Sequence, residues 1–331
     1  MRTLFTCSAI LLAALGAFMA AARPAPSLRL VARIPLENVE GRIDHFGIDV
    51  KGERLFMSAL GNNTVEVLDL RANKRLHTIT GVHEPQGTTY APDSNRIYVA
   101  NGGDGAVRIF DGTSYKLLDT IRFSSDADDT RYDAATRRVY VGYGEGAVAA
   151  MDSATGKVLG EIKVSGHPEA YEVEKGGGKI FINVPDARDI EVGDWGRKQI
   201  VARWPTGEYG ANFPMAVDPG EHRLFVVARR PAQLLVFDSE SGKIVAHVPV
   251  VGDSDDLWYD ATKRRIYISG GQGFVSAVAQ RDAAHYEALE NIPTGSGART
   301  SFFLPELGRL YVAVPHRGGQ LAELLVFAPA P

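Results

Sequence analysis

The segment RIYVA at residues 96–100 decides the fold, because versions of it occur seven times along the chain. Each copy begins with a basic residue and continues with aliphatic and aromatic residues in a pattern typical of a β-strand. The copies are separated by 42, 42, 41, 44, 42 and 44 residues. They read RLFMS at 54, RIYVA at 96, RVYVG at 138, KIFIN at 179, RLFVV at 223, RIYIS at 265 and RLYVA at 309.

Each repeat holds more than this one strand. A short apolar strand precedes the segment, and a turn rich in Gly, Asn or Pro follows it and leads to a third and a fourth strand. Four short antiparallel strands in a repeat of about 42 residues are typical of a β-propeller blade. Five third strands end in an aspartate, which we interpret as a turn residue that accepts backbone hydrogen bonds. These residues are Asp69, Asp111, Asp152, Asp194 and Asp238.

The last repeat stops after three strands, whereas residues 28–36 (LRLVARIPL) form a predicted strand that belongs to no repeat. We expect this strand to complete blade seven, because pairing removes an exposed sheet edge. The sequence therefore predicts an all-β fold, a seven-bladed β-propeller of four-stranded antiparallel blades closed by the N-terminal strand. Residues 23–331 are expected to form this single domain, with blades that start near residues 43, 84, 126, 167, 211, 253 and 297.

Residues 1–22 differ from the rest of the chain. One arginine precedes an apolar run that ends in small residues, a pattern that predicts a signal peptide cleaved after Ala22. The alternative is an uncleaved anchor helix, since the run is about as long as a short membrane span. The single cysteine, Cys7, lies in this segment, so the mature chain would have no disulfide and no thiolate metal site. We expect a periplasmic or secreted protein with no membrane span after cleavage.

Composition and motifs exclude several classes of function. The chain is 45% hydrophobic and 23% charged, as expected of a globular protein, and its net charge of −4 gives no general affinity for nucleic acid. The sequence contains no G-x-S-x-G, H-E-x-x-H, P-loop or dinucleotide-binding motif. No catalytic class is therefore indicated by a motif.

The candidate site comes from loops that differ between the repeats. Two sets of loops, those leading into each first strand and those joining second to third strands, meet at one face of a propeller around its channel. Acidic groups come mainly from blades three, four and six and basic groups from blades five and seven, which predicts a mouth with two electrostatic sides. The candidate ligand-binding residues are His45, Gln86, Asp128, Asp129, His167, Glu169, Asp186, Arg229, Arg230, Asp255, Asp256, Arg299 and His316.

Two of these loops are near copies, DADD at 126–129 and DSDD at 253–256. Crowded carboxylates repel unless protons, arginine or a cation neutralise them. Some of these aspartates could cap their own turns, and a bound divalent cation such as calcium or magnesium is an alternative. Histidines of three loops leave a zinc or copper site open, although hydrogen-bonded histidine is commoner. The arginines suit either a carboxylate or phosphate ligand or the acids of the rim itself.

Blade two carries a family resemblance in APDSNRIYVANGGDGAVRIFD at residues 91–111. This segment resembles the YVTN-type repeat of bacterial propellers, with Tyr98–Asn101 in the place of the YVTN strand. The whole mature chain is similar to the exported, YncE-like group, a resemblance that implies the seven-bladed fold. Relatives of the wider fold include lactonases, a lyase and single-stranded DNA binders, and no catalytic motif of theirs is carried over.

We expect the rim of the channel to bind a small polar ligand or a partner protein. The alternative is a lactonase-type hydrolase or lyase, in which His167, Glu169 or a rim aspartate would act as acid or base, with or without a metal. Nucleic acid is the least favoured ligand, because single strands need a positive groove with aromatic platforms and this rim is largely acidic. The sequence assigns neither the ligand nor an oligomeric state.

Overall fold

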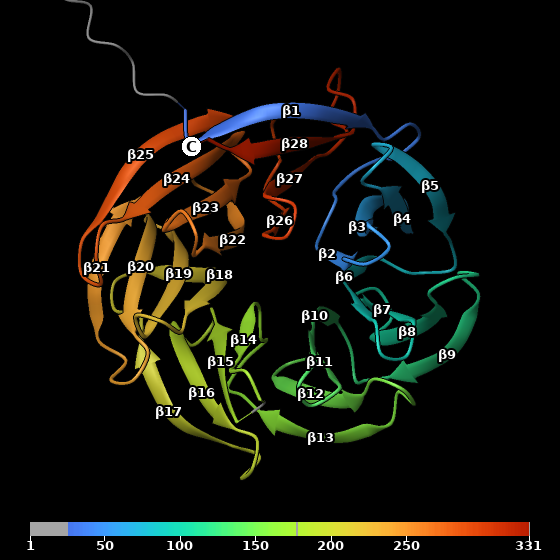
Figure 1. Ribbon diagram of the computed structural model, residues 1–331. Coiled ribbons are helices and arrows are strands. Elements are labelled where there is room, and N and C mark those ends of the chain that lie inside the picture. Colours follow the sequence, from blue (N-terminus) through green and yellow to red (C-terminus); the bar gives the residue numbers. More distant parts are fainter. Residues whose placement is uncertain (1–25, 177, 331) are drawn as a thin grey trace, which may run out of the picture.

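A computed structural model describes residues 26–176 and 178–330 as seven four-stranded sheets arranged in a ring (Figure 1). All pairings within the sheets are antiparallel, and the one helical element among the described residues is a short 3-10 turn at Leu60–Asn62. The predicted seven-bladed β-propeller is confirmed. The predicted signal peptide, residues 1–22, lies outside the described residues. Within those residues, no helix has the length and apolar character needed to cross a membrane.

Each blade runs from an inner strand at the channel to an outer strand at the outside of the ring. Blade one comprises β2 (Phe46–Asp49), β3 (Arg54–Ala59), β4 (Thr64–Asp69) and β5 (Lys74–Ile79). Blade two comprises β6 (Pro85–Ala91), β7 (Arg96–Asn101), β8 (Ala106–Asp111) and β9 (Leu117–Arg122). Blade three comprises β10 (Ala127–Asp133), β11 (Arg138–Tyr143), β12 (Ala147–Asp152) and β13 (Val158–Lys163). Blade four comprises β14 (Tyr171–Val173), β15 (Lys179–Val184), β16 (Asp189–Asp194) and β17 (Gln199–Pro205). Blade five comprises β18 (Gly210–Asp218), β19 (Arg223–Arg230), β20 (Ala232–Asp238) and β21 (Ile244–Pro249). Blade six comprises β22 (Ser254–Asp260), β23 (Arg265–Gly270), β24 (Phe274–Gln280) and β25 (Tyr286–Pro293).

Blade seven closes the ring with strands from both ends of the chain. It contains β26 (Ser301–Leu304), β27 (Arg309–Val314) and β28 (Glu323–Pro329), and β1 (Leu28–Pro35) forms its outer strand. β1 pairs with β28 along its whole length, and Figure 1 shows the blue N-terminal strand beside the red C-terminal one. The prediction that the N-terminal strand closes the last blade is confirmed.

The repeated segment is the second strand of each blade, and its third residue fills the space between neighbouring sheets. Every such aromatic side chain is at most 3% exposed. Since each blade packs against two neighbours, the second strand needs apolar residues on both faces, which explains the nearly continuous hydrophobic pattern. The seven residues are Phe56, Tyr98, Tyr140, Phe181, Phe225, Tyr267 and Tyr311.

The five repeated aspartates at the ends of the third strands are turn residues, as predicted. The Asp69 carboxylate accepts hydrogen bonds from the backbone N–H groups of Arg71 and Ala72, both at 2.9 Å. The other four aspartates accept backbone hydrogen bonds from one or two residues of the same turn. These carboxylates therefore have a local structural role at the face opposite the leading loops.

If β1 holds the ring closed, truncating its buried face must destabilise the whole propeller. We expect Ile34→Ala, at a fully buried position, to lower the free energy of unfolding by about 2–5 kcal/mol. Urea denaturation followed by circular dichroism measures this. Val31→Ala is the matched control, because Val31 lies on the same strand at 37% exposure, and we expect it to cost about 0.5 kcal/mol or less. Equal effects of the two substitutions would contradict the closure.

Candidate functional site

Strand pairing defines equivalent positions in the seven blades. Asp49 pairs with Arg54 in blade one, and Asp133 pairs with Arg138 in blade three, so the first residues of the two pairs correspond. The residue five places before this position lies at the mouth of the channel in every blade. We call these residues the upper ring. It consists of Asp44, Gln86, Asp128, Glu169, Phe213, Asp255 and Arg299.

The next residue of each blade forms a second layer, the lower ring. Backbone hydrogen bonds support the equivalence, since the carbonyl groups of His45, Ala170 and Thr300 each accept from the second strand of their own blade at 2.9–3.1 Å. In blades two, three, five and six the inner strand has a β-bulge here, which changes the direction of the side chains. The lower ring consists of His45, Gly87, Asp129, Ala170, Pro214, Asp256 and Thr300.

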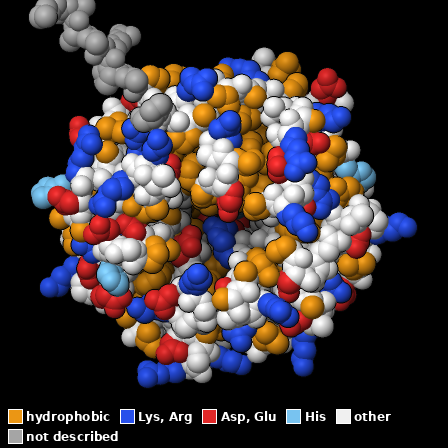
Figure 2. Space-filling view, in the orientation of Figure 1, with side chains coloured by type: hydrophobic (Ala, Val, Ile, Leu, Met, Phe, Trp, Pro, Cys, Tyr) orange, Lys and Arg blue, Asp and Glu red, His pale blue; other side chains and the backbone are white. Residues whose placement is uncertain are grey.

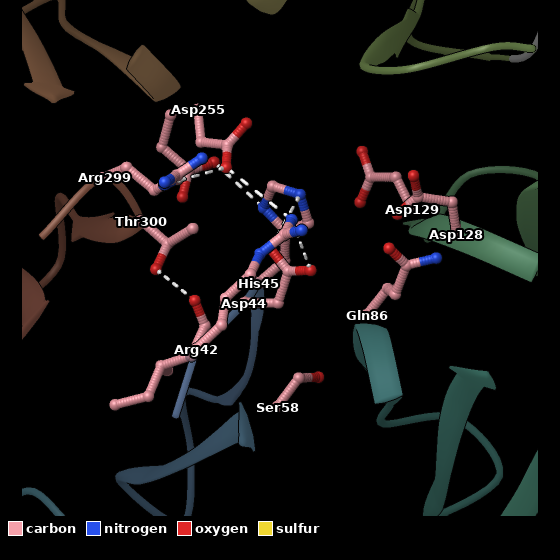
Figure 3. A network of polar contacts seen from close by, with 12 residues as sticks. Arg42, Asp44, His45, Ser58, Gln86, Asp128, Asp129, Asp255, Arg299 and Thr300 are labelled. Carbon is pink, nitrogen blue, oxygen red and sulfur yellow. Dashed lines mark hydrogen bonds and ion pairs between the residues drawn. The ribbon is translucent and has the colours of Figure 1, made fainter. Parts of the chain in front are cut away.

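One half of the upper ring is neutralised by arginine. Asp255 is in contact with Arg229, and its Oδ2 atom lies 3.8 Å from Arg42 Nη2 and 3.9 Å from Arg299 Nε. Arg42 also donates to both oxygens of the fully buried Asp44, at 2.9 and 3.1 Å. Figure 3 shows Asp255, Arg299, Arg42 and Asp44 gathered on one side of the mouth. Three arginines from blades one, five and seven thus surround the central aspartate of blade six.

The other half of the upper ring keeps an excess of carboxylates. Asp128 Oδ2 lies 3.3 Å from His167 Nε2, while Asp126 accepts a hydrogen bond of 2.8 Å from Gln86. The Glu169 carboxyl makes no hydrogen bond or ion pair with any residue that the structure describes. Asp128 and Gln86 lie across the mouth from the arginine half in Figure 3. Three carboxylates of blades three and four therefore face one histidine, so this is the acidic half.

The ionisation of the acidic half reflects this imbalance. Burial, together with the charges of Asp128 and Asp255, raises the pKa of Glu169 to about 8. Burial acts to lower the pKa of His167, but the hydrogen bonds to Asp128 and to the Gly144 carbonyl, together with the charges of Asp128 and Glu169, outweigh it and raise the pKa to about 9. At neutral pH His167 is therefore charged, and the Glu169 carboxyl is largely protonated.

The lower ring places a charged histidine inside the channel. His45 Nδ1 lies 3.2 Å from Asp256 Oδ1 and its Nε2 lies 3.8 Å from Asp44 Oδ1. Burial acts to lower the pKa of His45, but these carboxylates raise it well above its ordinary value. Asp129 pairs with Arg131 in the same layer. A small cavity of about 10 Å³ lies beside His45, Arg131 and Asp256, with room for about one water molecule.

Ten of the thirteen predicted site residues belong to this polar network. They are His45, Gln86, Asp128, Asp129, His167, Glu169, Arg229, Asp255, Asp256 and Arg299. The structure places the three others outside this network. Asp186 and Arg230 line a cavity of about 430 Å³ between blades four and five, whose wall also includes Phe213 and Arg229, and His316 pairs with Glu40 at 2.8 Å. Asp186 and His316 follow a second strand and Arg230 is the last residue of one, and second strands lie farther from the axis than inner strands.

The sequence analysis missed four charged residues around the channel: Arg42, Asp44, Arg131 and Glu172. Alignment of the blades contains a signal for Asp44, which occupies the same position as Asp128. Arg131 and Glu172 lie inside inner strands, two or three residues beyond the rings, so period-2 alternation from the lower ring would have placed both on the channel side. The predicted site residues came from loops, which leaves out Arg131 and Glu172 but not Arg42 and Asp44, which lie in the loop before β2.

Among the described residues, no arrangement of side chains matches the metal sites that the sequence left open as alternatives. Within residues 26–176 and 178–330, no group of three or more His, Asp or Glu side chains is placed to hold a metal ion. Of the three loop histidines, His45 and His167 pair with different carboxylates, and His83 is exposed. The donor atoms as arranged fit neither the divalent cation nor the zinc or copper site.

No protein-family model and no curated protein matches the chain. Solved structures do match it. A chain of hydrazine synthase from Kuenenia stuttgartiensis is 15% identical with a TM-score of 0.74, over 83% of this chain and 94% of that one. A chain of a mitotic checkpoint complex is 14% identical with a TM-score of 0.78, over 99% of both chains. At these identities the likeness shows the propeller fold.

Substitutions in the two acidic triplets are expected to differ in their cost. We expect Asp255→Asn to lower the free energy of unfolding by about 3 kcal/mol, because Arg229 loses its ion-pair partner while Arg42 and Arg299 keep Asp44 and Asp253 but lose a second nearby anion. Asp128→Asn should cost about 1 kcal/mol or less, since it weakens the contact with His167 but removes a charge that opposes the ionisation of Glu169. Urea denaturation of both variants at pH 7 makes the comparison, and equal losses would contradict the different neutralisation of the triplets.

The raised pKa of Glu169 predicts a pH dependence of stability. The folded protein binds this proton more tightly than the unfolded chain does, so the ionisable carboxyl lowers stability as pH rises from about 4.5 to about 8. We expect Glu169→Gln to be more stable than the wild type at pH 9 by about 1 kcal/mol or more, and equal to it near pH 4. Glu306→Gln, at an exposed position, is the control. A wild type that is the more stable of the two at pH 9 would refute this assignment.

Proposed function

We propose that the upper ring binds a small polar ligand through a cationic group seated between Asp128 and Glu169. The observation that carries the proposal is that equivalent residues of different blades have different ion-pair partners. Asp44 and Asp255 are held by arginines, whereas Glu169, at the same position of blade four, has no partner among the described residues. A cation that carries hydrogen-bond donors would supply the missing partner.

The mouth offers such a ligand both access and a second contact. The Asp126 side chain is 50% exposed and that of Arg42 is 45% exposed, so both halves of the upper ring reach solvent. Figure 2 shows a central hollow on one face of the ring, in which positive and negative side chains lie close together. Arg42 and Arg299 could then hold an anionic group of the same molecule, so a ligand with both charges fits the mouth best.

Family and location belong to the same proposal. The YVTN-like segment of blade two supports membership of the exported YncE-like group, and its Asn101 is fully buried and bonds to Val99, Ala106 and His83 of its own turn. The apolar pattern of residues 1–22 and the absence of cysteine after Cys7 support export to the periplasm or the medium. N-terminal sequencing of the protein from a periplasmic fraction tests this part.

A thermal-shift experiment tests the ligand class. Putrescine and arginine serve as cationic probes and succinate as the anionic one, because a ligand that binds the native state raises its melting temperature. We expect the cationic probes to raise the melting temperature by a few degrees at saturation. The shift should be lost in Asp128→Asn and Glu169→Gln and kept in Asp186→Asn, whose side chain lies outside the two rings. A partner protein or a lactone substrate becomes the better hypothesis if no cation stabilises the wild type.

A further inference from the structure

A second cavity occupies the opposite end of the channel. Its volume is about 590 Å³, within the range of small-molecule sites. His45 and Asp256 of the lower ring form its inner end, and it opens among Val50, Lys51 and Pro92. These three residues lie in turns after inner strands, on the face away from the loops that carry the upper ring. The cavity is therefore separate from the proposed polar site.

The walls of this cavity include several aromatic side chains, and the hydrogen-bonding groups of the tyrosine and tryptophan rings already have partners. The Tyr90 hydroxyl donates to Asn95 at 2.9 Å and the Tyr132 hydroxyl donates to Asp93 at 3.0 Å. Trp258 donates its Nε1–H group to a backbone carbonyl at 3.1 Å. The rings therefore offer carbon surface rather than hydrogen bonds to a ligand. The aromatic residues of the wall are Phe46, Tyr90, Tyr132, Trp258 and Phe302.

One carboxylate in the cavity makes no ion pair of its own, although Arg131 lies near enough for its charge to act on it. Three charged pairs in or beside the cavity are already satisfied: His45 with Asp256 at 3.2 Å and Arg131 with Asp129 toward the inner end, and Arg54 with Asp49 at 2.7 Å toward the opening. Lys51 lies exposed at the opening. Glu172 on β14 lines the cavity and is partly buried, but its carboxyl makes no hydrogen bond or ion pair with any described residue.

The surroundings of Glu172 favour a positively charged ligand. Burial raises the pKa of Glu172 to about 7, against the opposing effect of Arg131. A positive group beside the carboxylate would stabilise its ionised form. Aromatic faces attract the same group, because the ring quadrupole is negative over the face. The carboxylate and the aromatic walls thus select the same chemistry.

We propose that this cavity binds a small organic cation, a protonated or quaternary amine attached to an aromatic or aliphatic body. The ammonium group lies against Glu172, and the hydrocarbon body packs against Trp258 and Phe302, whose ring centroids are 4.8 Å apart. The lower ring separates this ligand from the upper mouth, so the two sites can be tested independently.

Calorimetric titration of the full mature chain at pH 8 with phenethylamine tests the site, with 2-phenylethanol as the uncharged probe of similar shape. We expect saturable binding of phenethylamine and at least tenfold weaker binding of the alcohol. Glu172→Gln keeps the shape and removes the charge, so it should weaken phenethylamine at least tenfold and leave the alcohol unchanged. Glu174→Gln is the matched control, because Glu174 is exposed, two residues away and outside the cavity wall. Trp258→Leu should weaken both probes.

Three results would overturn the assignment. The first is the absence of saturable phenethylamine binding by the wild type, and the second is an unchanged affinity in Glu172→Gln. The third is a loss of phenethylamine binding in Glu169→Gln but not in Glu172→Gln, which would place the amine at the upper mouth instead. Since the proposed function is tested with putrescine and Glu169, its failure is distinguishable from failure here. Circular dichroism of each variant confirms that the ring is folded.

Discussion

The pairing of β1 with β28 is the contact on which the rest of the molecule depends. It joins the two ends of the chain in one blade and removes the open edges of a seven-sheet array. Blade one is thereby held beside blade seven, where the Thr300 hydroxyl donates to the Ile43 carbonyl at 3.2 Å. Arg42 and Arg299 can approach Asp255 together only because this junction is closed.

In a closed ring, residues at the same backbone position of different blades can have neighbours of different charge. Asp128 and Asp255 come from near-identical segments and occupy the same position of their blades. One faces Glu169 and a single histidine, and the other faces three arginines. Local sequence sets the direction of each carboxylate through the bulge of its strand, whereas the adjoining blades set its charge environment.

Two channel carboxylates that make no hydrogen bond or ion pair with a described residue, Glu169 and Glu172, belong to blade four. Glu169 precedes β14 and Glu172 lies within it, and β14 is the shortest strand of the described chain. Tyr171 between them is fully buried and donates its hydroxyl to the Asp129 carbonyl at 2.7 Å, which ties this strand to blade three. The raised pKa values show that ionising these groups lowers stability. Retaining both at the channel lowers stability, and the two ligand sites proposed above would account for this cost.

The sequence by itself determined the fold. The repeated second strand and the spacing of about 42 residues indicate seven blades, and the extra N-terminal strand indicates how the last blade is completed. It also indicated that the loops before the inner strands carry polar residues. Only the tertiary structure decided which charges meet. Arg42 and Asp255 are more than two hundred residues apart, and no local pattern encodes that pairing. The cavity beside Glu172 likewise exists only after six blades converge, since its walls come from β2, β6, β10, β14, β22 and β26.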